Sequence, residues 1–367
     1  MVVFLCLGLL RGSADSILPH LLAYLVPDAG LTLRTGELPL AHLSSISYSR
    51  RDFAMKTVFI DGQEGTTGLK IRERLAGRTE FNLIEIDPAK RKDDAARREC
   101  LLSADIAILC LPDDASRKAY EWVHEHKTRL IDTSTAHRVT PGWAYGLPEL
   151  SPAHRDAIRS ARFVANPGCH ATGFLLGIFP LVATGMLQTS YPFVVNSITG
   201  YSGGGKQLIA KYEQGDPDQL SGPQPYSLAL RHKHLPEMQR IAGLDSAPAF
   251  MPIRARFYQG MVVSTLVHMR LLARSTTPSA LREQLASHYA GERFIRVLPF
   301  AAESELDAGG LSPLRCNDTN RADVFVFGHE DHALIAVCLD NLGKGASGAA
   351  IQNLNLMLGL PEDTGLQ

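Results

Sequence analysis

The chain has 367 residues, of which 45% are hydrophobic and 20% charged, and its formal net charge is -1 at pH 7. This length and composition predict an ordinary soluble chain with a substantial core and two domains. No basic excess is available to neutralise phosphates, so nucleic acid is not expected as the main partner.

Six cysteines are scattered through the chain without a C-x-x-C pair, and the 13 histidines include no H-E-x-x-H pattern. Neither a disulfide framework nor a zinc site is predicted, and no metal is expected. Unpaired cysteines in a chain of this size are typical of a reducing compartment, so we expect a cytoplasmic protein.

Residues 1–54 differ from the rest of the chain. The apolar run Val2–Leu10 is much shorter than the roughly twenty residues that span a bilayer. No basic segment precedes it, as a signal peptide would require, and no membrane association is expected. Residues 1–54 are an N-terminal extension that could be disordered, organellar or lineage-specific, or the product of a start assigned upstream of Met55. We favour the last, because Met55-Lys56 leads directly into a strand.

A strand, a glycine loop and a helix follow one another at Thr57–Asp61, Gly62–Gly68 and Leu69–Leu75. This order is typical of dinucleotide-binding folds, where glycines let the backbone approach a pyrophosphate at the helix N-terminus. The spacing G-x-x-G-x-x-G also fits a plain turn followed by a helix cap. The predicted cofactor-binding residues of the loop are Gly62, Gly65, Thr66, Thr67 and Gly68.

The second predicted strand, Phe81–Asp87, ends where such a fold meets the adenosine ribose. Asp87 by itself favours NAD, whereas the cations that follow it could hold the 2′-phosphate of NADP. We therefore predict NADP(H) as the cofactor, with Lys90 and Arg91 at that phosphate. The alternative is a solvated basic turn.

Two further strands, at Asp105–Pro112 and Arg129–Asp132, fit a parallel sheet covered on both faces. The ends of such strands line the ligand crevice. Pro112, at the start of the next helix, and Ser134, in the polar loop Thr133–Arg138, are therefore predicted to contact the cofactor. Residues 55–165 are predicted to form a doubly wound, Rossmann-type nucleotide-binding domain.

Cys169 follows the turn Asn166–Gly168, between a strand-like run at Phe163–Ala165 and an apolar helix that ends near Met186. The free N–H groups and the positive dipole end of that helix would favour thiolate over thiol. Cys169 is therefore a candidate nucleophile. The alternative is a small buried hydrophobic side chain.

After a strand at Tyr191–Thr199, Gly200 and Gly205-Lys206 have the spacing of a P-loop. Gln207 stands where that motif needs a Ser or Thr to bind magnesium, which argues against an NTPase. The loop still offers backbone N–H groups and a cation to an anion.

His232 and His234 lie beside basic residues, and long strands follow at Phe250–Ile253 and Gly260–Leu272. These strands predict a mixed sheet that carries the second half of an active site. Because both histidines lie in the same predicted domain as Cys169, one of them is a candidate acid/base. The small residues of Asn341–Asn353 would let a helix start pass close to another backbone or to a cofactor.

The chain from Met55 to about Leu360 resembles the N-acetyl-γ-glutamyl-phosphate reductases, and it looks closest to the shorter, second type. The motifs that carry this resemblance occur in the family's order and are Gly62–Gly68, Asn166–Cys169, Ser202–Lys206, His232–Glu237 and Asp340–Ala346. The resemblance implies an α/β fold shared with semialdehyde and glyceraldehyde-phosphate dehydrogenases, with a Rossmann-type domain and an α+β catalytic domain. It also implies NADPH-dependent reduction of N-acetyl-glutamyl 5-phosphate to the 5-semialdehyde, with release of phosphate, in arginine biosynthesis.

By position, the resemblance makes Cys169 the nucleophile that forms a thioester and His234 the general acid/base, with His232 as the less favoured substitute. It places the segment Asn341–Ala346 near the nicotinamide, through residues Asn341, Lys344 and Gly345. The residues expected to hold the anionic substrate are Arg138, Ser202, Lys206 and Arg231.

The resemblance also implies that residues 166–340 form a catalytic and oligomerisation domain, and that residues 341–367 return to the nucleotide-binding domain as a helix. A homo-oligomer, either a dimer or a tetramer, is expected. Two alternatives stay open. One is a related dehydrogenase acting on aspartyl or aminoadipyl phosphate, and the other is a non-catalytic NADP-binding regulator.

Overall fold

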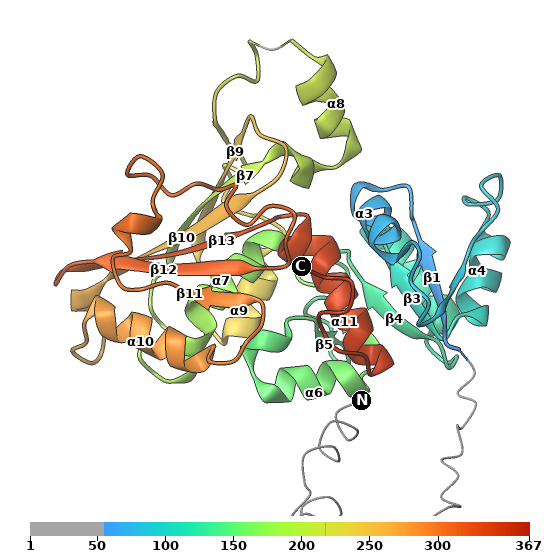
Figure 1. Ribbon diagram of the computed structural model, residues 1–367, viewed down its shortest axis with the longest axis horizontal. Helices are drawn as coiled ribbons and strands as arrows, with labels where there is room; N and C mark the ends of the chain where they lie inside the picture. The colour runs from blue at the N-terminus through green and yellow to red at the C-terminus, as the bar shows by residue number, and fades with distance from the viewer. Residues whose placement is uncertain (1–54, 217) are drawn as a thin grey trace, which may run out of the picture. The chain divides into compact units, whose positions relative to one another are not determined.

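The computed structural model describes residues 55–216 and 218–367, and the interpretation of residues 1–54 as an extension lies outside this range. Two sheets and the helices that cover them make up the described chain (Figure 1). Residues 57–165 supply the first sheet and residues 194–339 the second. The predicted α/β class, with a doubly wound domain beside a mixed-sheet domain, is confirmed.

The first sheet has six parallel strands in the order β2-β1-β3-β4-β6-β5. The strands are β1 Thr57–Asp61, β2 Asn82–Ile84, β3 Ile106–Leu109, β4 Arg129–Asp132, β5 Ala144–Tyr145 and β6 Phe163–Ala165. The central strand β3 is buried at every position, as expected for a parallel strand covered on both faces. The carboxyl ends of parallel strands meet at one edge, and the loops that leave this edge build the site.

Helices cover both faces of the first sheet. One face carries α4 (Asp94–Ser103) and α5 (Asp113–Val123), and the other carries α3 (Thr66–Leu75), α6 (Pro152–Ser160) and α11 (Gly348–Leu358). Ile351 and Leu354 of α11 are fully buried in the same cluster as Val58 and Ile60 of β1. Figure 1 shows α11, in red, between the two sheets. The C-terminal helix thus completes the core of the first domain.

The second sheet has seven strands in the order β11-β12-β13-β10-β7-β9-β8. The strands are β7 Val194–Gly200, β8 Gln224–Pro225, β9 Ala249–Ala255, β10 Met261–His268, β11 Ile295–Val297, β12 Ala322–Gly328 and β13 His332–Leu339. The pairs β7/β9 and β11/β12 are parallel and the others antiparallel, so the sheet is mixed.

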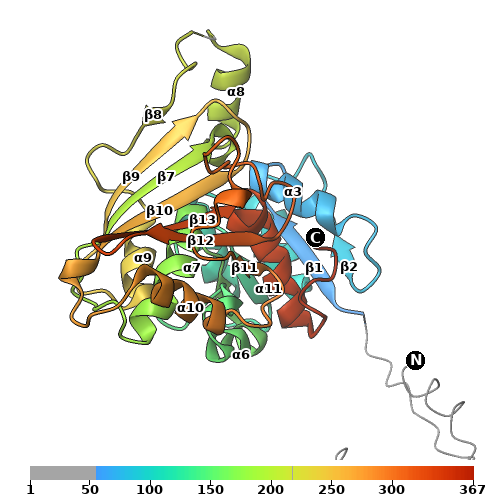
Figure 2. The same ribbon diagram turned by 60° about the vertical axis from the view of Figure 1, so that its left-hand side comes forward.

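One face of the second sheet is covered by helices, as Figure 2 shows. These helices are α7 (Cys169–Ala183), α9 (Leu235–Ala242) and α10 (Pro278–His288), while α8 (Lys206–Gln214) follows β7. Side chains of β7 alternate between the two faces: Val195 and Ser197 are buried, whereas Val194 and Ile198 are exposed. The outer face of β7 therefore presents apolar side chains to solvent.

Some elements differ from those that the sequence predicts. The strand predicted over Phe81–Asp87 covers only Asn82–Ile84, because β2 is an edge strand that pairs with β1 alone over three residues. The strand predicted over Gly260–Leu272 ends at His268, where a short 3-10 helix begins. Helices α4, α6, α9 (Leu235–Ala242) and α10 have no counterpart among the predicted elements.

Candidate active site

Five α-helices of the described chain begin at one cleft with a volume of about 690 Å³, and three of them, α3, α7 and α8, have no acidic residue in the first turn. The residues that precede α3, α7 and α8 are Gly65, Gly168 and Gly205, and all three line the cleft. None of these N-termini has a side-chain cap or an acidic residue in its first turn. Unpaired backbone N–H groups and the positive dipole ends of three helices therefore meet at the cleft, which suits an anionic ligand.

The glycine loop between β1 and α3 forms one wall of the cleft. Gly62 has a φ of +86°, and a Cβ there would overlap the carbonyl oxygen of Cys110. A Cβ at Gly68 would overlap the carbonyl oxygen of Gly62, so only glycine fits both positions. Thr66 Oγ1 is buried and has no hydrogen-bond partner in the described part of the chain. An orphaned hydroxyl at an uncapped helix start fits a phosphate of a dinucleotide.

Cys169 is the first residue of α7, and hydrogen bonds fix the turn before it from two sides. The backbone N–H of Gly168 donates to Glu237 Oε2 over 3.1 Å. Asn166 Nδ2 donates to the carbonyl oxygen of Ala346 over 3.0 Å. The turn is thus tied both to α9 and to the segment that precedes α11.

Two glycines allow other groups to approach Cys169 closely. A Cβ on Gly168 would lie 2.5 Å from Cε1 and Nε2 of His234. A Cβ on Gly345 would lie 2.6 Å from the Cβ of Cys169. Neither position accepts a larger residue unless its neighbour moves, so the Gly168 backbone lies against the His234 ring and the Gly345 backbone lies against Cys169.

Burial raises the pKa of the Cys169 thiol to about 11, although Arg138 and the backbone N–H of His170 lower it. The expectation that the helix N-terminus favours a thiolate at rest is wrong here, because desolvation of the charged sulfur outweighs those contributions. At neutral pH the side chain is a thiol. A base must therefore remove its proton before it attacks.

His234 precedes α9, and its side chain is buried in the wall of the cleft. Burial lowers the pKa of His234 well below its usual value, and Arg138 lowers it further. The imidazole is therefore neutral at pH 7 and able to accept a proton. Its Nδ1 has no hydrogen-bond partner among the residues described.

His232 and His170 are also close to His234 but differ in their contacts. The ring centroid of His232 lies 4.7 Å from that of His234, and burial lowers the pKa of His232 to about 4. His170 uses both ring nitrogens, with Nδ1 2.9 Å from Ser197 Oγ and Nε2 2.9 Å from Tyr226 Oη. Burial lowers its pKa to about 3. His170 is thus a structural link to Tyr226 rather than a free base.

Glu237 is a buried carboxylate that the sequence analysis does not single out as a site residue. It accepts hydrogen bonds from Arg138 Nη1 (2.6 Å), Tyr145 Oη (2.7 Å) and the N–H of Gly168 (3.1 Å). The one available signal is its place in the first turn of the helix that follows His234, where a carboxylate is favoured. Its three partners come from distant parts of the chain, which no local pattern reports.

Besides Arg138, three cations line the cleft, namely Lys206, Lys233 and Arg254. The Arg254 guanidinium lies over the ring of Tyr226, 4.6 Å from its centroid. Sequence reasoning finds Lys206 through its glycine loop and misses the other two, since a single cation on a strand or between histidines forms no motif. Together they give the cleft a charge that complements an anionic substrate.

Most of the predicted site residues line the cleft. They are Gly65, Thr66, Thr67, Gly68, Pro112, Ser134, Arg138, Cys169, Ser202, Lys206, His234, Asn341 and Gly345. Two of them already have partners within the protein. Arg138 donates to the carbonyl oxygens of Asn166 and Thr133, and Ser202 Oγ accepts from the side-chain amide Nδ2 of Asn341.

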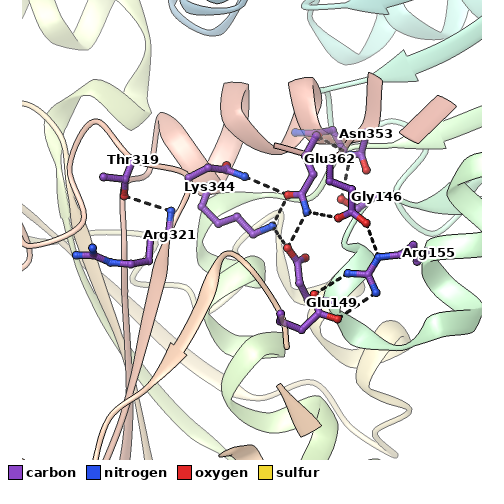
Figure 3. A network of polar contacts seen from close by, with 12 residues as sticks. Gly146, Glu149, Arg155, Thr319, Arg321, Lys344, Asn353 and Glu362 are labelled. Carbon is purple, nitrogen blue, oxygen red and sulfur yellow. Dashed lines mark hydrogen bonds and ion pairs between the residues drawn. The ribbon is translucent and has the colours of Figure 1, made fainter. Parts of the chain in front are cut away.

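Other predicted site residues do not line the cleft, namely Gly62, Lys90, Arg91, Arg231 and Lys344. The sequence predicts that Lys344 contacts the cofactor. In the structure its side chain is instead fully buried and donates to Glu149 and Gln352 (Figure 3). Arg231 is exposed outside the cleft. Lys90 and Arg91 are exposed beyond β2, and Arg91 lies 3.8 Å from Glu64 of the glycine loop.

Within residues 55–216 and 218–367, no three His, Cys, Asp or Glu side chains are grouped so that they could bind a metal ion. The same residues contain no helix with the length and apolar character needed to cross a bilayer. The described cysteines, Cys100, Cys110, Cys169, Cys316 and Cys338, are free thiols.

Two family models match the two domains. The model described as "Semialdehyde dehydrogenase, NAD binding domain" matches residues 49–160. The model described as "Semialdehyde dehydrogenase, dimerisation domain" matches residues 169–341 and therefore begins at Cys169.

Curated relatives are similar over almost their whole length. N-acetyl-gamma-glutamyl-phosphate reductase 2 of Nostoc sp. is 46% identical over 317 residues, which are 84% of this chain and 98% of the relative. N-acetyl-gamma-glutamyl-phosphate reductase of Rhizobium leguminosarum is 49% identical over 304 residues, which are 82% of this chain and 98% of the relative. The chain belongs to the N-acetyl-gamma-glutamyl-phosphate reductase family. The resemblance seen in the sequence is confirmed.

Solved structures of aspartate semialdehyde dehydrogenases share the fold of this reductase-family chain. Aspartate semialdehyde dehydrogenase II of Vibrio cholerae superposes with a TM-score of 0.65 at 18% identity and covers 83% of this chain and 99% of its own. The enzyme of Candida albicans, solved with NADP, has a TM-score of 0.55 at 15% identity and covers 83% of this chain and 98% of its own. At these identities the likeness concerns the fold alone.

The buried histidines predict that the protein loses stability in mild acid. The folded state keeps His170, with a pKa of about 3, and His232, with a pKa of about 4, neutral, whereas the unfolded chain protonates both below about pH 6.5. The unfolded state then binds more protons, so the free energy of unfolding falls by about 1.4 kcal/mol per pH unit for each histidine as the pH decreases. Urea unfolding between about pH 7 and pH 4.5 measures this slope.

The variant His170→Gln should reduce the slope by one proton, while His124→Gln, at an exposed histidine, should leave it unchanged. A slope that is the same in wild type and His170→Gln would contradict the neutral, buried state of His170.

Proposed function

We propose that the protein is an NADPH-dependent N-acetyl-γ-glutamyl-phosphate reductase. It reduces N-acetyl-L-glutamyl 5-phosphate to N-acetyl-L-glutamate 5-semialdehyde and releases phosphate, as a step of arginine biosynthesis. The observation that carries the proposal is the Cys169 thiol at a helix start, in one cleft with neutral His234 and a glycine loop. The names of the relatives supply the substrate. The free cysteines support a reducing, cytoplasmic setting.

The glycine loop supports a dinucleotide at the first domain. Gly65, Thr66 and Thr67 at the start of α3 would bind the pyrophosphate through backbone N–H groups and the unpartnered Thr66 hydroxyl. Lys90 and Arg91 would meet a 2′-phosphate, and the contact of Arg91 with Glu64 supports this, since it keeps the cation beside the glycine loop. When bound, NADPH supplies the hydride that reduces the acyl group.

Cys169 and His234 share the first chemical step. Neutral His234 takes the proton of the Cys169 thiol, and the sulfur attacks the acyl carbon of the substrate. A C–S bond forms while the bond from carbon to the phosphate oxygen breaks, so phosphate leaves and a thioester on Cys169 remains. A bound acyl phosphate adds negative charge near His234, which stabilises the imidazolium that this proton transfer creates.

The second step releases the cysteine. After reduction of the thioester carbonyl, the C–S bond breaks, the aldehyde forms and the sulfur recovers its proton from His234. The uncapped N-terminus of α7 offers backbone N–H groups to the negative charge that develops at the carbonyl oxygen.

The second domain offers groups for the phosphate and the carboxylate of the substrate. Lys206 stands at the start of α8, whose N-terminus is uncapped, and Arg254 approaches from β9. Arg138 and Ser202 also line the cleft, but their bonds to backbone and to Asn341 make them supports of these groups. Arg231 is exposed and outside the cleft, so Arg254 replaces it as the proposed guanidinium contact.

The variant Cys169→Ala should lower kcat by at least about 10³-fold, because the thioester can no longer form. The assay is phosphate-dependent reduction of NADP with N-acetylglutamate 5-semialdehyde, run beside aspartate semialdehyde. NADPH binding, followed by its fluorescence, should persist, and Cys100→Ala in α4 is the matched control with full activity. Activity in Cys169→Ala would rule out the covalent route, and preference for aspartate semialdehyde would reassign the substrate.

The variant His234→Asn should lower kcat by about 10²- to 10⁴-fold, because the thiol loses its proton acceptor. Alkylation of Cys169 by iodoacetamide at high pH should remain possible, since hydroxide can deprotonate the thiol. His232→Asn should have the smaller effect on kcat. If the two variants exchange these results, His232 is the acid/base.

We further propose that the protein forms a homodimer through the outer face of the second sheet. Val194 and Ile198 of β7, Met251 of β9 and Leu266 of β10 are exposed on adjacent strands of this face. The register places Leu266 beside Val194, so the side chains form one patch. An exposed apolar patch on a sheet is typical of a protein interface, and the family model of this domain is described as a dimerisation domain.

The variant Leu266→Asp should convert the dimer to a monomer, because dimerisation would bury an unpaired carboxylate. Light scattering after size exclusion measures the mass. Leu69→Asp, at an exposed leucine of α3, is the control and should stay dimeric. A Leu266→Asp variant with unchanged mass would place the interface elsewhere.

A further inference from the structure

Lys344 is a charged side chain with no exposure to solvent. Its Nζ donates to Glu149 Oε1 over 2.6 Å and to Gln352 Oε1 over 2.7 Å. Glu149, in the 3-10 helix Pro148–Leu150, is equally buried, and Lys344 and Gln352 lower its pKa against the effect of burial. Figure 3 shows the pair at the centre of a polar network.

The network continues from this pair to the surface. Gln352 Nε2 donates to Glu149 Oε1 (2.8 Å) and to Glu362 Oε2 (3.0 Å). Arg155 Nε donates to Glu362 Oε1 (2.6 Å), and the same guanidinium donates twice to Glu292. The ion pair therefore links the segment before α11 to α6, to the C-terminal tail and to the end of α10.

A buried ion pair needs an explanation other than stability. Removing two charges from water costs about as much as their attraction returns, and apolar residues of similar volume are often as stable. Such a pair instead fixes the relative positions of its two residues, because each charge tolerates few positions of the other. The geometry that Lys344 fixes is that of its own backbone.

The backbone around Lys344 forms a π-helical turn, Gly343–Ser347. In this turn the N–H of Gly345 donates to the carbonyl oxygen of Asp340 over 2.9 Å. Gly345 and Ala346 line the cleft, whereas Lys344 does not. Gly345 is also the residue whose added Cβ would lie 2.6 Å from the Cβ of Cys169. One side of the turn thus contacts the nucleophile and the other is held by the ion pair.

We propose that Lys344 is a positioning residue that acts on Cys169 through the backbone of Gly345. The ion pair with Glu149 holds the turn Gly343–Ser347 in place, and the Gly345 backbone of this turn packs against Cys169 and holds the partly buried thiol in one orientation. The inference rests on the proposed role of Cys169 as the nucleophile. Lys344 therefore positions Cys169 from outside the cleft and does not contact the cofactor itself.

The test uses a variant without the ion pair, Lys344→Met with Glu149→Gln, so that no unpaired charge is left buried. Freed from the pair, the turn should withdraw from Cys169 and expose the thiol. The alkylation of Cys169 by iodoacetamide is measured by mass spectrometry of the peptide that contains it. The alkylation rate near pH 7.5 should become about tenfold faster, and its pH profile should shift to lower pH. The value of kcat should fall about 10- to 100-fold with little change in KM, since misplacing a reacting group by about 1 Å has that effect.

The buried thiols Cys316 and Cys338 separate this result from general loosening of the fold. They should stay unlabelled while Cys169 reacts faster. Gln352→Met removes one acceptor of Lys344 without changing charge, and it should produce a weaker effect of the same kind. It keeps the test usable if the double variant does not fold.

The matched control is Arg129→Met. Arg129 Nη1 donates to the carbonyl oxygen of Met357 over 2.6 Å, so the control weakens the far end of α11 and leaves the turn intact. It should leave Cys169 alkylation and kcat unchanged. Equal effects of Arg129→Met and the double variant, or labelling of Cys316 and Cys338 together with Cys169, would overturn the proposal.

An unchanged Cys169 alkylation profile in both Lys344→Met/Glu149→Gln and Gln352→Met would also overturn it. Alkylation needs no substrate, so this arm is independent of the proposed reaction. If wild type fails to reduce NADP with N-acetylglutamate 5-semialdehyde, the proposed function fails, while the alkylation profiles still decide whether Lys344 controls Cys169.

Discussion

The rest of the site depends on the hydrogen bonds that the Glu237 carboxylate accepts. It accepts hydrogen bonds from Gly168, the residue before the nucleophile, from Arg138 and from Tyr145. Because Glu237 lies in the first turn of α9, these bonds also fix the start of that helix, which His234 immediately precedes. One buried carboxylate thus sets the position of the cysteine turn relative to its base. Its charge is balanced by Arg138, without which the burial of a carboxylate would be costly.

The same burial decides how the nucleophile is activated. Three uncapped helix N-termini without an acidic first turn meet at the cleft, and by themselves they favour negative charge. At Cys169 desolvation is the larger effect and holds the thiol protonated, while it holds His234 neutral. Cys169 and His234 are therefore both uncharged before substrate binds. The positive helix ends therefore act on the anionic ligands and on the oxyanion of the reaction, more than on the resting sulfur.

The sequence predicts the parts of the fold and the site that depend on neighbours along the chain. The order strand, glycine loop, helix places Gly65–Gly68 correctly at the cleft, and Pro167-Gly168 places Cys169 at a helix start. Contacts between distant segments are not encoded in this way. Arg254 belongs to no local pattern, and the motif His232–Glu237 by itself does not show that Lys233 lines the cleft or that Glu237 binds three distant groups. Lys344 lies in a segment that does reach the cleft, yet a π-helical turn directs its side chain into the core, and the sequence gives no sign of that turn.

Two glycines show why a site of this kind needs residues without side chains beside its nucleophile. Gly168 leaves room for the ring of His234 and for Arg138, and Gly345 leaves room for Cys169 itself. With a Cβ at either place, the base or the 345 backbone would have to retreat by a distance that matters for proton transfer and for attack. Glu237 holds the Gly168 backbone on one side, and the Lys344–Glu149 pair holds the Gly345 backbone on the other. This close approach of the backbone is what makes a partly buried, protonated cysteine usable as a nucleophile.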